Sequence, residues 1–381
     1  MGDVLSVEPR ECGANSAVAE VSWGSGSYTV EDSANVTLTN TPTAWLASGL
    51  ALAMSKGSPL HIAGAVDPVA LAGAGKAQDL LASWWPDTIH KVDVVSDVAP
   101  VPGPDGRGVG CFFSGGLDSF YSAIKNQDEI THLIHVYGFD IFLNAEAYYA
   151  KVIEGLREAA AEMGKALIEI RTNIRFLHEK RWGGWDMGHG VAMAHMAHLL
   201  SGHLYKVLVP ASDHVSSLQP YPTHPELDPL WSSSAVEIVY DGLEATRVDK
   251  ARLVKDSAAA MKHMRVCFWN REDRQNCGRC EKCVRTMVNM RIAGAGDRCV
   301  AFPPVDPVTL LPRVALNDSH RAYVRENLSA LREAGLDDPD LEAALVRALN
   351  RGPLENLRGQ LSWKWEIAKQ AGHAARNRVR G

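Results

Sequence analysis

The chain has 381 residues, of which 46% are hydrophobic and 22% charged, and its formal net charge is −6. This length predicts about two domains with ample core, and the negative charge does not favour a nucleic-acid partner. No apolar run is long enough to span a membrane and no signal-peptide pattern opens the chain, so we expect a cytoplasmic protein without membrane contact.

The first 98 residues are predicted to form a small α/β accessory domain. Apolar and β-branched runs between turn residues predict strands, and apolar residues at helical spacing predict helices. The expected strands are Ala17–Trp23 and Ser27–Glu31, which form a hairpin, Pro59–Ala63 and Lys91–Val95; the expected helices are Thr43–Met54 and Pro68 to about Trp85. Asp67 is a typical N-cap before Pro68. Without a catalytic signature, this part is expected to serve docking, dimerisation or substrate positioning.

A glycine-rich turn follows the proline- and glycine-rich boundary at 99–107 (APVPGPDGR). Val109–Phe113 is a short apolar run typical of a buried parallel strand. The turn and the helix start that follow it are Ser114, Gly115, Gly116, Leu117, Asp118 and Ser119. Backbone N–H groups in such a turn, together with the helix dipole, favour a phosphate. An ordinary glycine turn is the alternative, but the full string SGGLDS after a strand predicts a nucleotide loop.

Further strands alternate with helices after this loop. Strands are expected at 132–136, 167–171 and 206–210, and helices at about 145–163 and 191–200. This alternation predicts a parallel sheet, and ligands bind at the carboxyl ends of such strands. The loops that begin at Ser114, Gly138, Thr172 and Ala211 should therefore surround one crevice.

Several residues of these loops are candidates for nucleotide binding. Asp118 is expected to coordinate Mg²⁺ with the ATP phosphates, because a hard cation prefers carboxylate and phosphate oxygens, with N-capping as its alternative role. The hydroxyls of Ser114 and Ser119 are placed to donate to phosphate. Gly138 and Asp140 follow the next strand, where Asp140 could hold ribose or metal, or be a solvated loop acid.

Later segments add a catalytic candidate, His189, and the acceptor-side candidates Ser212, His224 and Asp228. The glycine- and tryptophan-rich stretch Trp182–Gly190 suggests close ligand approach, and its His189 is a candidate phosphate contact or proton donor, or a helix-capping histidine. Ser212 follows the fourth strand. His224 and Asp228 lie in a proline-containing loop that could shape a site or be a surface turn.

Basic residues at a later helix start are candidate pyrophosphate ligands. Arg247 and Lys250 could reach pyrophosphate oxygens, whose charge develops in the transition state. A solvated basic face is the alternative.

Four cysteines have the spacing of a metal site. Cys267, Cys277, Cys280 and Cys283 form C-x9-C-x2-C-x2-C. Four thiolates suit a tetrahedral structural Zn²⁺, while buried free cysteines or a [4Fe–4S] cluster are the alternatives. The seven cysteines of the chain fit a metal site in a reducing compartment better than a disulfide framework.

The C-terminal part, residues 297–381, opens with a proline-rich connector. Helices are expected near 318–334, 339–349 and 353–376, followed by a solvated basic tail. We therefore expect three parts: an accessory domain at 1–98, a nucleotide-binding catalytic domain with the cysteine site at 106–296, and a helical extension at 297–381.

The string SGGLDS resembles the signature of the PP-loop ATP pyrophosphatase superfamily. Combined with C-x9-C-x2-C-x2-C, it is similar over roughly residues 106–295 to the 7-cyano-7-deazaguanine synthase family. The resemblance implies an adenine nucleotide alpha hydrolase-like α/β domain that uses ATP, Mg²⁺ and Zn²⁺. It also implies cleavage of ATP between its α and β phosphates, activation of a carboxylate by AMP, and attack by ammonia to give an amide and then a nitrile.

The expected function is therefore that of an adenylating carbon–nitrogen ligase, which activates a carboxylate or carbonyl oxygen for attack by ammonia or another nitrogen nucleophile. Its acceptor would be a small carboxylated molecule, such as a deazapurine or a natural-product intermediate. Ammonia would be free or delivered by a partner, and a homodimer is left open. Two alternatives remain: a sulfur transferase that thiolates a nucleoside or RNA, and a nucleotide-dependent module that senses nucleotide or modifies a protein.

Overall fold

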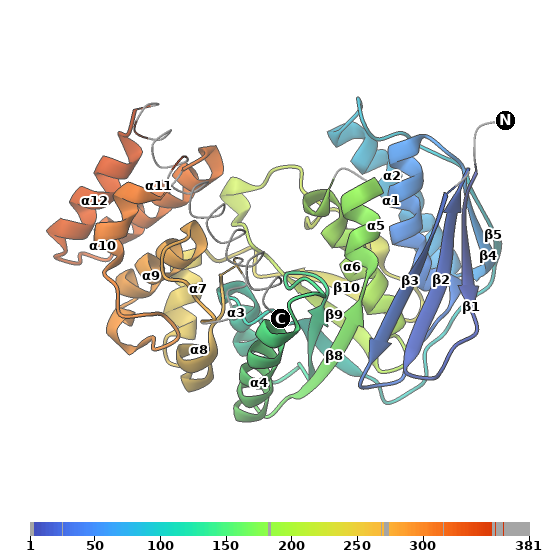
Figure 1. Ribbon diagram of the computed structural model, residues 1–381, viewed down its shortest axis with the longest axis horizontal. Helices are drawn as coiled ribbons and strands as arrows, with labels where there is room; N and C mark the ends of the chain where they lie inside the picture. Colours follow the sequence, from blue (N-terminus) through green and yellow to red (C-terminus); the bar gives the residue numbers. More distant parts are fainter. Residues whose placement is uncertain are drawn as a thin grey trace, which may run out of the picture. The chain divides into compact units, whose positions relative to one another are not determined.

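The computed structural model describes residues 4–24, 26–181, 184–267, 269, 274–314, 316–352, 355 and 361. The chain divides into two compact units, Met1–Glu244 and Ala245–Gly381. The first unit contains a large sheet with helices, which confirms the α/β class (Figure 1). None of the helices in the described residues is both long and apolar enough to span a bilayer.

The first unit is built on a ten-stranded sheet in the order β10-β9-β6-β7-β8-β3-β2-β1-β4-β5. The strands are β1 Leu5–Arg10, β2 Ser16–Trp23, β3 Gly26–Ala34, β4 Leu60–Val66, β5 Val94–Val98, β6 Gly108–Phe112, β7 His132–Tyr137, β8 Ala166–Thr172, β9 Leu204–Pro210 and β10 Glu237–Asp241. All neighbours from β10 to β8 pair in parallel. The pairs β8–β3, β3–β2 and β2–β1 are antiparallel, and β1–β4 and β4–β5 are again parallel.

Helices pack on this sheet and form a common hydrophobic core with it. They are α1 Leu46–Lys56, α2 Pro68–Trp84, α3 Leu117–Lys125, α4 Glu146–Glu162, α5 Ile174–Arg181 and α6 Trp185–Leu199. Helix α6 packs against α1 and α5, and these three lie on the face of the sheet opposite α4 (Figure 1). Buried side chains of the N-terminal strands and of the parallel strands, such as Val21 and Val207, belong to one hydrophobic cluster. The N-terminal strands therefore extend the parallel sheet.

Residues 99–107, the predicted domain boundary, are hydrogen-bonded to other parts of the first unit. The backbone N–H of Val101 donates to Asp67 Oδ2 at 3.1 Å. The Arg107 guanidinium donates to the carbonyl oxygens of Ser201 at 3.1 Å and Leu204 at 3.4 Å. The expected domain boundaries at 98, 106 and 296 remain predictions. The boundary between the two compact units falls between Glu244 and Ala245.

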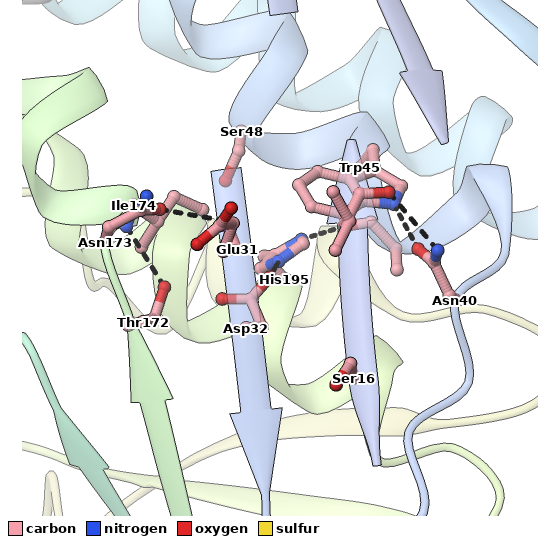
Figure 2. Close-up of polar contacts among 12 residues, drawn as sticks. Ser16, Glu31, Asp32, Asn40, Trp45, Ser48, Thr172, Asn173, Ile174 and His195 are labelled. Atoms are coloured by element: carbon pink, nitrogen blue, oxygen red, sulfur yellow. Dashed lines mark hydrogen bonds and ion pairs between the residues drawn. The ribbon is translucent and has the colours of Figure 1, made fainter. Parts of the chain in front are cut away.

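Two asparagines extend the short antiparallel junction between β3 and β8. The paired residues run from Asp32–Thr172 to Ala34–Ile170. Beyond one end, Asn173 Oδ1 accepts from Glu31 N at 2.9 Å and its Nδ2 donates to Thr29 O at 3.1 Å (Figure 2). Beyond the other, Asn35 Oδ1 accepts from Glu169 N at 2.9 Å and its Nδ2 donates to Leu167 O at 3.0 Å. Side-chain amides thus replace the missing ladder bonds on both sides.

A buried ion pair links the N-terminal strands to α6. Figure 2 shows His195 of α6 beside Asp32 of β3, with the Trp45 ring next to it. His195 Nε2 lies 3.0 Å from Asp32 Oδ2 and its Nδ1 lies 2.6 Å from Ala44 O, and both side chains are fully buried. Both ring nitrogens face oxygen atoms, so this side chain ties α6 to β3 and to the segment that precedes α1.

The described part of the second unit contains helices. They are α7 Arg247–Val254, α8 Ala258–His263, α9 Glu281–Ile292, α10 Pro307–Leu310, α11 Asp318–Glu333 and α12 Pro339–Leu349. Helices α9 and α11 share a buried contact in which Asn289 Nδ2 donates to Asn327 Oδ1 at 2.6 Å. The helix expected at 353–376 falls outside the described residues, apart from positions 355 and 361.

Candidate functional site

The predicted nucleotide loop joins β6 to α3. Gly115 has φ +78°, a left-handed conformation that favours glycine, and Gly116 is the N-cap of α3. Ser114 Oγ accepts from Gly116 N at 3.3 Å, and Ser119 Oγ donates to Gly116 O at 3.0 Å. The first turn of a helix leaves N–H groups without intrahelical acceptors, and here these follow directly on the turn. Proteins commonly bind anions at helix starts of this kind, and an anion at this loop stays a prediction.

Asp118 and Ser119 differ in their surroundings. Asp118 is half-buried in the first turn of α3, and because Gly116 is the N-cap, the alternative capping role of Asp118 is wrong. Ser119 is buried and its hydroxyl is engaged by Gly116, so a phosphate contact would require that hydroxyl to rotate. Its observed role is to hold the turn closed.

The order of the parallel strands places this loop at a distinctive point. In chain order the five strands β6, β7, β8, β9 and β10 lie in the sequence 3-2-1-4-5. The chain runs outward from β6 to β8 and then returns to β9 on the other side of β6. Loops at the carboxyl ends of strands flanking such a reversal form ligand-binding crevices. The loop Ser114–Gly116 follows β6, and Ser212 follows β9, so both flank this switch point.

Gly138 has a structural reason to be glycine. Its φ is +111°, and a Cβ on it would lie 2.0 Å from the carbonyl oxygen of Thr172. The ends of β7 and β8 therefore approach each other too closely for a side chain. Asp140, two residues later, is exposed. A nucleotide role for either residue stays a prediction.

The segment with His189 is the start of a helix. Helix α6 begins at Trp185, six residues before the predicted start, and Trp182 lies outside the described residues. His189 is half-buried; its ring centroid lies 5.1 Å from that of Tyr221. A Cβ on Gly190 would lie 1.9 Å from the Pro222 carbonyl oxygen, so this glycine permits close packing of α6 on the loop at 222.

His224 and Asp228 belong to a compact, buried turn. His224 O accepts from Asp228 N at 2.9 Å, and Asp228 Oδ1 accepts from His224 N at 3.2 Å. The His224 ring lies edge-on to Trp84 of α2, with centroids 4.9 Å apart. Burial raises the pKa of Asp228 well above its usual value, because desolvation disfavours the charged carboxylate. Ser212 is exposed, and an acceptor-binding role for these three residues stays a prediction.

Arg247 and Lys250 belong to the second unit. They lie in the first turns of α7, which Thr246 and Asp249 cap reciprocally. Arg247 is 7% exposed and Lys250 1%, so the alternative of a solvated basic face is wrong. Their expected pyrophosphate role remains a prediction.

The four cysteines form a buried cluster in the second unit. Their Sγ atoms all lie within 4.8 Å of one another, which confirms the expected grouping of Cys267 with the other three. Cys277 Sγ lies 3.8 Å from Cys283 Sγ, and Cys280 Sγ lies 3.9 Å from Cys267 Sγ. A tetrahedron with metal–sulfur bonds of about 2.3 Å places its sulfurs about 3.8 Å apart. The cluster therefore fits a tetrahedral thiolate-bound metal such as zinc.

Backbone donors favour a thiolate at Cys277, while the four cysteines affect one another's ionisation. Backbone N–H groups of Arg279 and Cys280 donate to Cys277 Sγ at 3.4 and 3.2 Å. Hydrogen bonds from the other thiols lower the pKa of Cys267, and contact with Cys267 in turn raises that of Cys280 and Cys283. Without a cation the four cannot all lose their protons, whereas a divalent metal makes this favourable.

Asn276 is not among the residues that the sequence motifs indicate. It is 2% exposed, and its side chain bonds to the backbone of the segment that carries Cys267. Its position next to Cys277 is the signal that could have drawn attention to it.

No family model, curated protein or solved structure that was compared with the chain matches it. The family resemblance therefore rests on the two motifs.

Proposed function

We propose that the chain binds ATP at the loop Ser114–Ser119 and uses it to adenylate a carboxylate on a small molecule. One observation carries this proposal: the string SGGLDS forms the turn after β6 and the first residues of α3, at the reversal of a 3-2-1-4-5 sheet. A glycine turn and a helix N-terminus at such a reversal support phosphate binding.

Different groups of the loop would bind the phosphates and the Mg²⁺ ion of the nucleotide. The backbone N–H groups of the first turn of α3 would donate to phosphate oxygens, with the Ser114 hydroxyl beside them. Asp118 would bind Mg²⁺, which neutralises phosphate charge. The φ of +78° at Gly115 supports this reading, since the turn brings backbone rather than side chains toward the ligand.

The reaction has two steps. A carboxylate oxygen of the acceptor attacks the α-phosphorus, the bond to the β-phosphate oxygen breaks, and pyrophosphate leaves. Ammonia then attacks the carbonyl carbon of the acyl adenylate, AMP leaves, and the nitrogen loses a proton to give the amide. With a second ATP, the amide oxygen would attack the α-phosphorus and release pyrophosphate; loss of AMP, which carries that oxygen, and of the remaining N–H proton would then give a nitrile.

The cysteines favour a nitrogen nucleophile over persulfide-based sulfur transfer. Four of the seven belong to the metal cluster. Cys111 is fully buried in β6 and burial raises its pKa; burial also raises the pKa of Cys299 to about 11. A nucleophilic thiol must ionise and be accessible, so neither residue suits that role. Cys12 is exposed and donates to Ser16 O, which leaves it as the one cysteine whose substitution could test thiolation.

The four-cysteine cluster is proposed to hold a structural Zn²⁺. Four thiolate ligands close the coordination sphere, so the metal would supply folding free energy rather than chemistry. Removal of the metal with a chelator should lower the unfolding temperature while the protein retains its ability to bind ATP when folded.

The products of ATP cleavage test the proposed reaction. With ammonia and candidate carboxylates, the wild-type protein should form AMP and pyrophosphate, and Ser114→Ala and Asp118→Ala should lower the rate by about 10²-fold or more. Asp128→Ala, at an exposed aspartate beyond the far end of α3, is the matched control and should retain the wild-type rate. Formation of ADP and phosphate, or wild-type turnover in both loop variants, would refute the proposal.

A further inference from the structure

The side chain of Asn276 joins two segments of the metal cluster. Its Oδ1 accepts from the backbone N–H groups of Val266 at 3.0 Å and Cys267 at 3.3 Å. Its Nδ2 donates to the carbonyl oxygens of Met264 at 2.7 Å and Ala301 at 2.9 Å. An asparagine amide can accept two and donate two hydrogen bonds, so all four are made. Reversing the amide would place its oxygen against two carbonyl oxygens, which fixes its orientation.

Cys267 needs such a bond more than the other three ligands do. Cys277, Cys280 and Cys283 lie close together in sequence, at a turn and at the start of α9. Cys267 comes from a separate segment, yet its Sγ lies 3.9 Å from Cys280 Sγ. Bringing distant parts of a chain together has an entropic cost, and a contact that holds them together beforehand reduces the cost of binding.

We propose that Asn276 is the positioning residue of the metal centre. It fixes the backbone of Cys267 against the segment that carries the other three cysteines, so that four sulfurs meet at tetrahedral spacing. This inference rests on the proposed zinc site. Outer contacts that orient ligands typically change metal affinity by about 10–100-fold.

A second close contact keeps the same segments together. A Cβ on Gly278, whose φ is +71°, would lie 2.4 Å from the ring of Pro303. The chain after Ala301 therefore packs directly on the turn between Cys277 and Cys280. Asn276 also donates to Ala301 O, so its side chain bonds both to this segment and to the segment of Cys267.

Asn327 offers a matched control for a general loss of packing. It is 3% exposed in the same unit, and its Oδ1 accepts from Asn289 on α9 at 2.6 Å. Asn327→Ala removes a buried amide of the same kind without touching the Cys267 segment. It should lower stability with and without metal to a similar extent.

The test measures transfer of zinc from the loaded protein to a chromophoric chelator. Asn276→Ala should release zinc about 10–100-fold faster than the wild type, and Asn327→Ala at the wild-type rate. Asn276→Asp keeps the acceptor for Val266 and Cys267 but sets an oxygen against two carbonyls. It should fold with zinc and release it at an intermediate rate, which preserves the test if the alanine variant does not fold.

Cobalt(II) substitution gives a second readout that loss of stability alone does not move. In Asn276→Ala the thiolate-to-cobalt charge-transfer band should weaken as Cys267 leaves the coordination sphere, while in Asn327→Ala it should be unchanged. Zinc release from Asn276→Ala no faster than from Asn327→Ala, with a wild-type cobalt spectrum, would overturn the positioning role. A wild-type protein that holds no zinc would instead refute the metal centre itself.

Discussion

At the scale of single residues, the buried carboxylate of Asp67 has an unusually complete set of donors. Its Oδ1 accepts from Val69, Ala70 and Ser234, and its Oδ2 from Val101, all backbone N–H groups at 3.0–3.2 Å. The residue caps α2, as predicted, and also holds two later segments that the sequence does not connect with it.

Asp67→Ala should lower the free energy of unfolding by about 3–5 kcal/mol, since a lost cap costs about 1 kcal/mol and buried N–H groups left without acceptors add more. Urea unfolding measures this change. Asp79→Ala on the same helix is the matched control, because its exposed pair with Lys91 should contribute less than about 1 kcal/mol. Equal losses in the two variants would show that the added bonds of Asp67 are unimportant.

The charge of Asp67 makes part of this stability depend on pH. Burial alone would raise its pKa, but the backbone hydrogen bonds outweigh burial and lower it. The contribution is therefore present above the unfolded pKa of about 3.9 and is lost as pH falls through the folded pKa. The stability difference between wild type and Asp67→Asn should shrink from pH 7 toward pH 3. A difference that stays constant over that range would assign the effect to shape rather than charge.

The Asp32–His195 pair should behave as a buried ion pair does. Asp32→Ala or His195→Ala should each cost about 3–5 kcal/mol, because each leaves a buried polar partner without its mate. The double variant Asp32→Ala/His195→Ala should lose less stability than the sum of the two single losses. Unfolding free energies of the full cycle measure the coupling, and strictly additive losses would mean that the pair does not interact.

At the scale of elements, the amide bridges at Asn35 and Asn173 predict a local effect. The double variant Asn35→Ala/Asn173→Ala removes side-chain bonds worth about 0.5–1.5 kcal/mol each. Hydrogen exchange should accelerate in β3 and β8 while β6 and β9 stay protected. Uniform acceleration across the sheet, or none, would contradict a local role at this junction.

Local patterns predict many elements well, and the misses have physical causes. Asp67 and Pro68 start α2 where expected, because capping depends on adjacent residues. The predicted start of α6 is too late because Gly188 and Gly190 are poor helix formers. They lie in the helix because a side chain at either position would collide with His178 or Pro222. Strands β1 and β10 were not predicted, since β1 carries Glu8 and Pro9, and β10 is a short strand at the sheet edge.

In the candidate site too, features set by neighbouring residues are predictable from the sequence, and features set by long-range contacts are not. The cysteine cluster follows from the spacing of the cysteines. The turn after β6 follows from a contiguous string, and its nucleotide role stays a prediction. The acceptor-side candidates depend on long-range contacts: His224 packs on Trp84, which lies in the part of the chain expected to be a separate domain. A single sequence does not reveal that Asp32 and Thr172 are strand partners, and so it does not reveal that the N-terminal strands join the parallel sheet.

At the scale of the whole molecule, the single sheet that joins the N-terminal strands to the parallel strands predicts that residues 1–105 are required for folding. Without them β8 loses β3 as its partner, His195 loses Asp32, and α6 loses its packing on α1. A protein comprising residues 106–381 should therefore lack a cooperative thermal transition by circular dichroism and should aggregate in size-exclusion chromatography. Co-expression of 1–105 as a separate chain should restore a soluble complex, because the missing strands and helices can then pair. A monomeric 106–381 chain with a sharp transition would show instead that the parallel half folds alone and that the N-terminal half is an accessory domain.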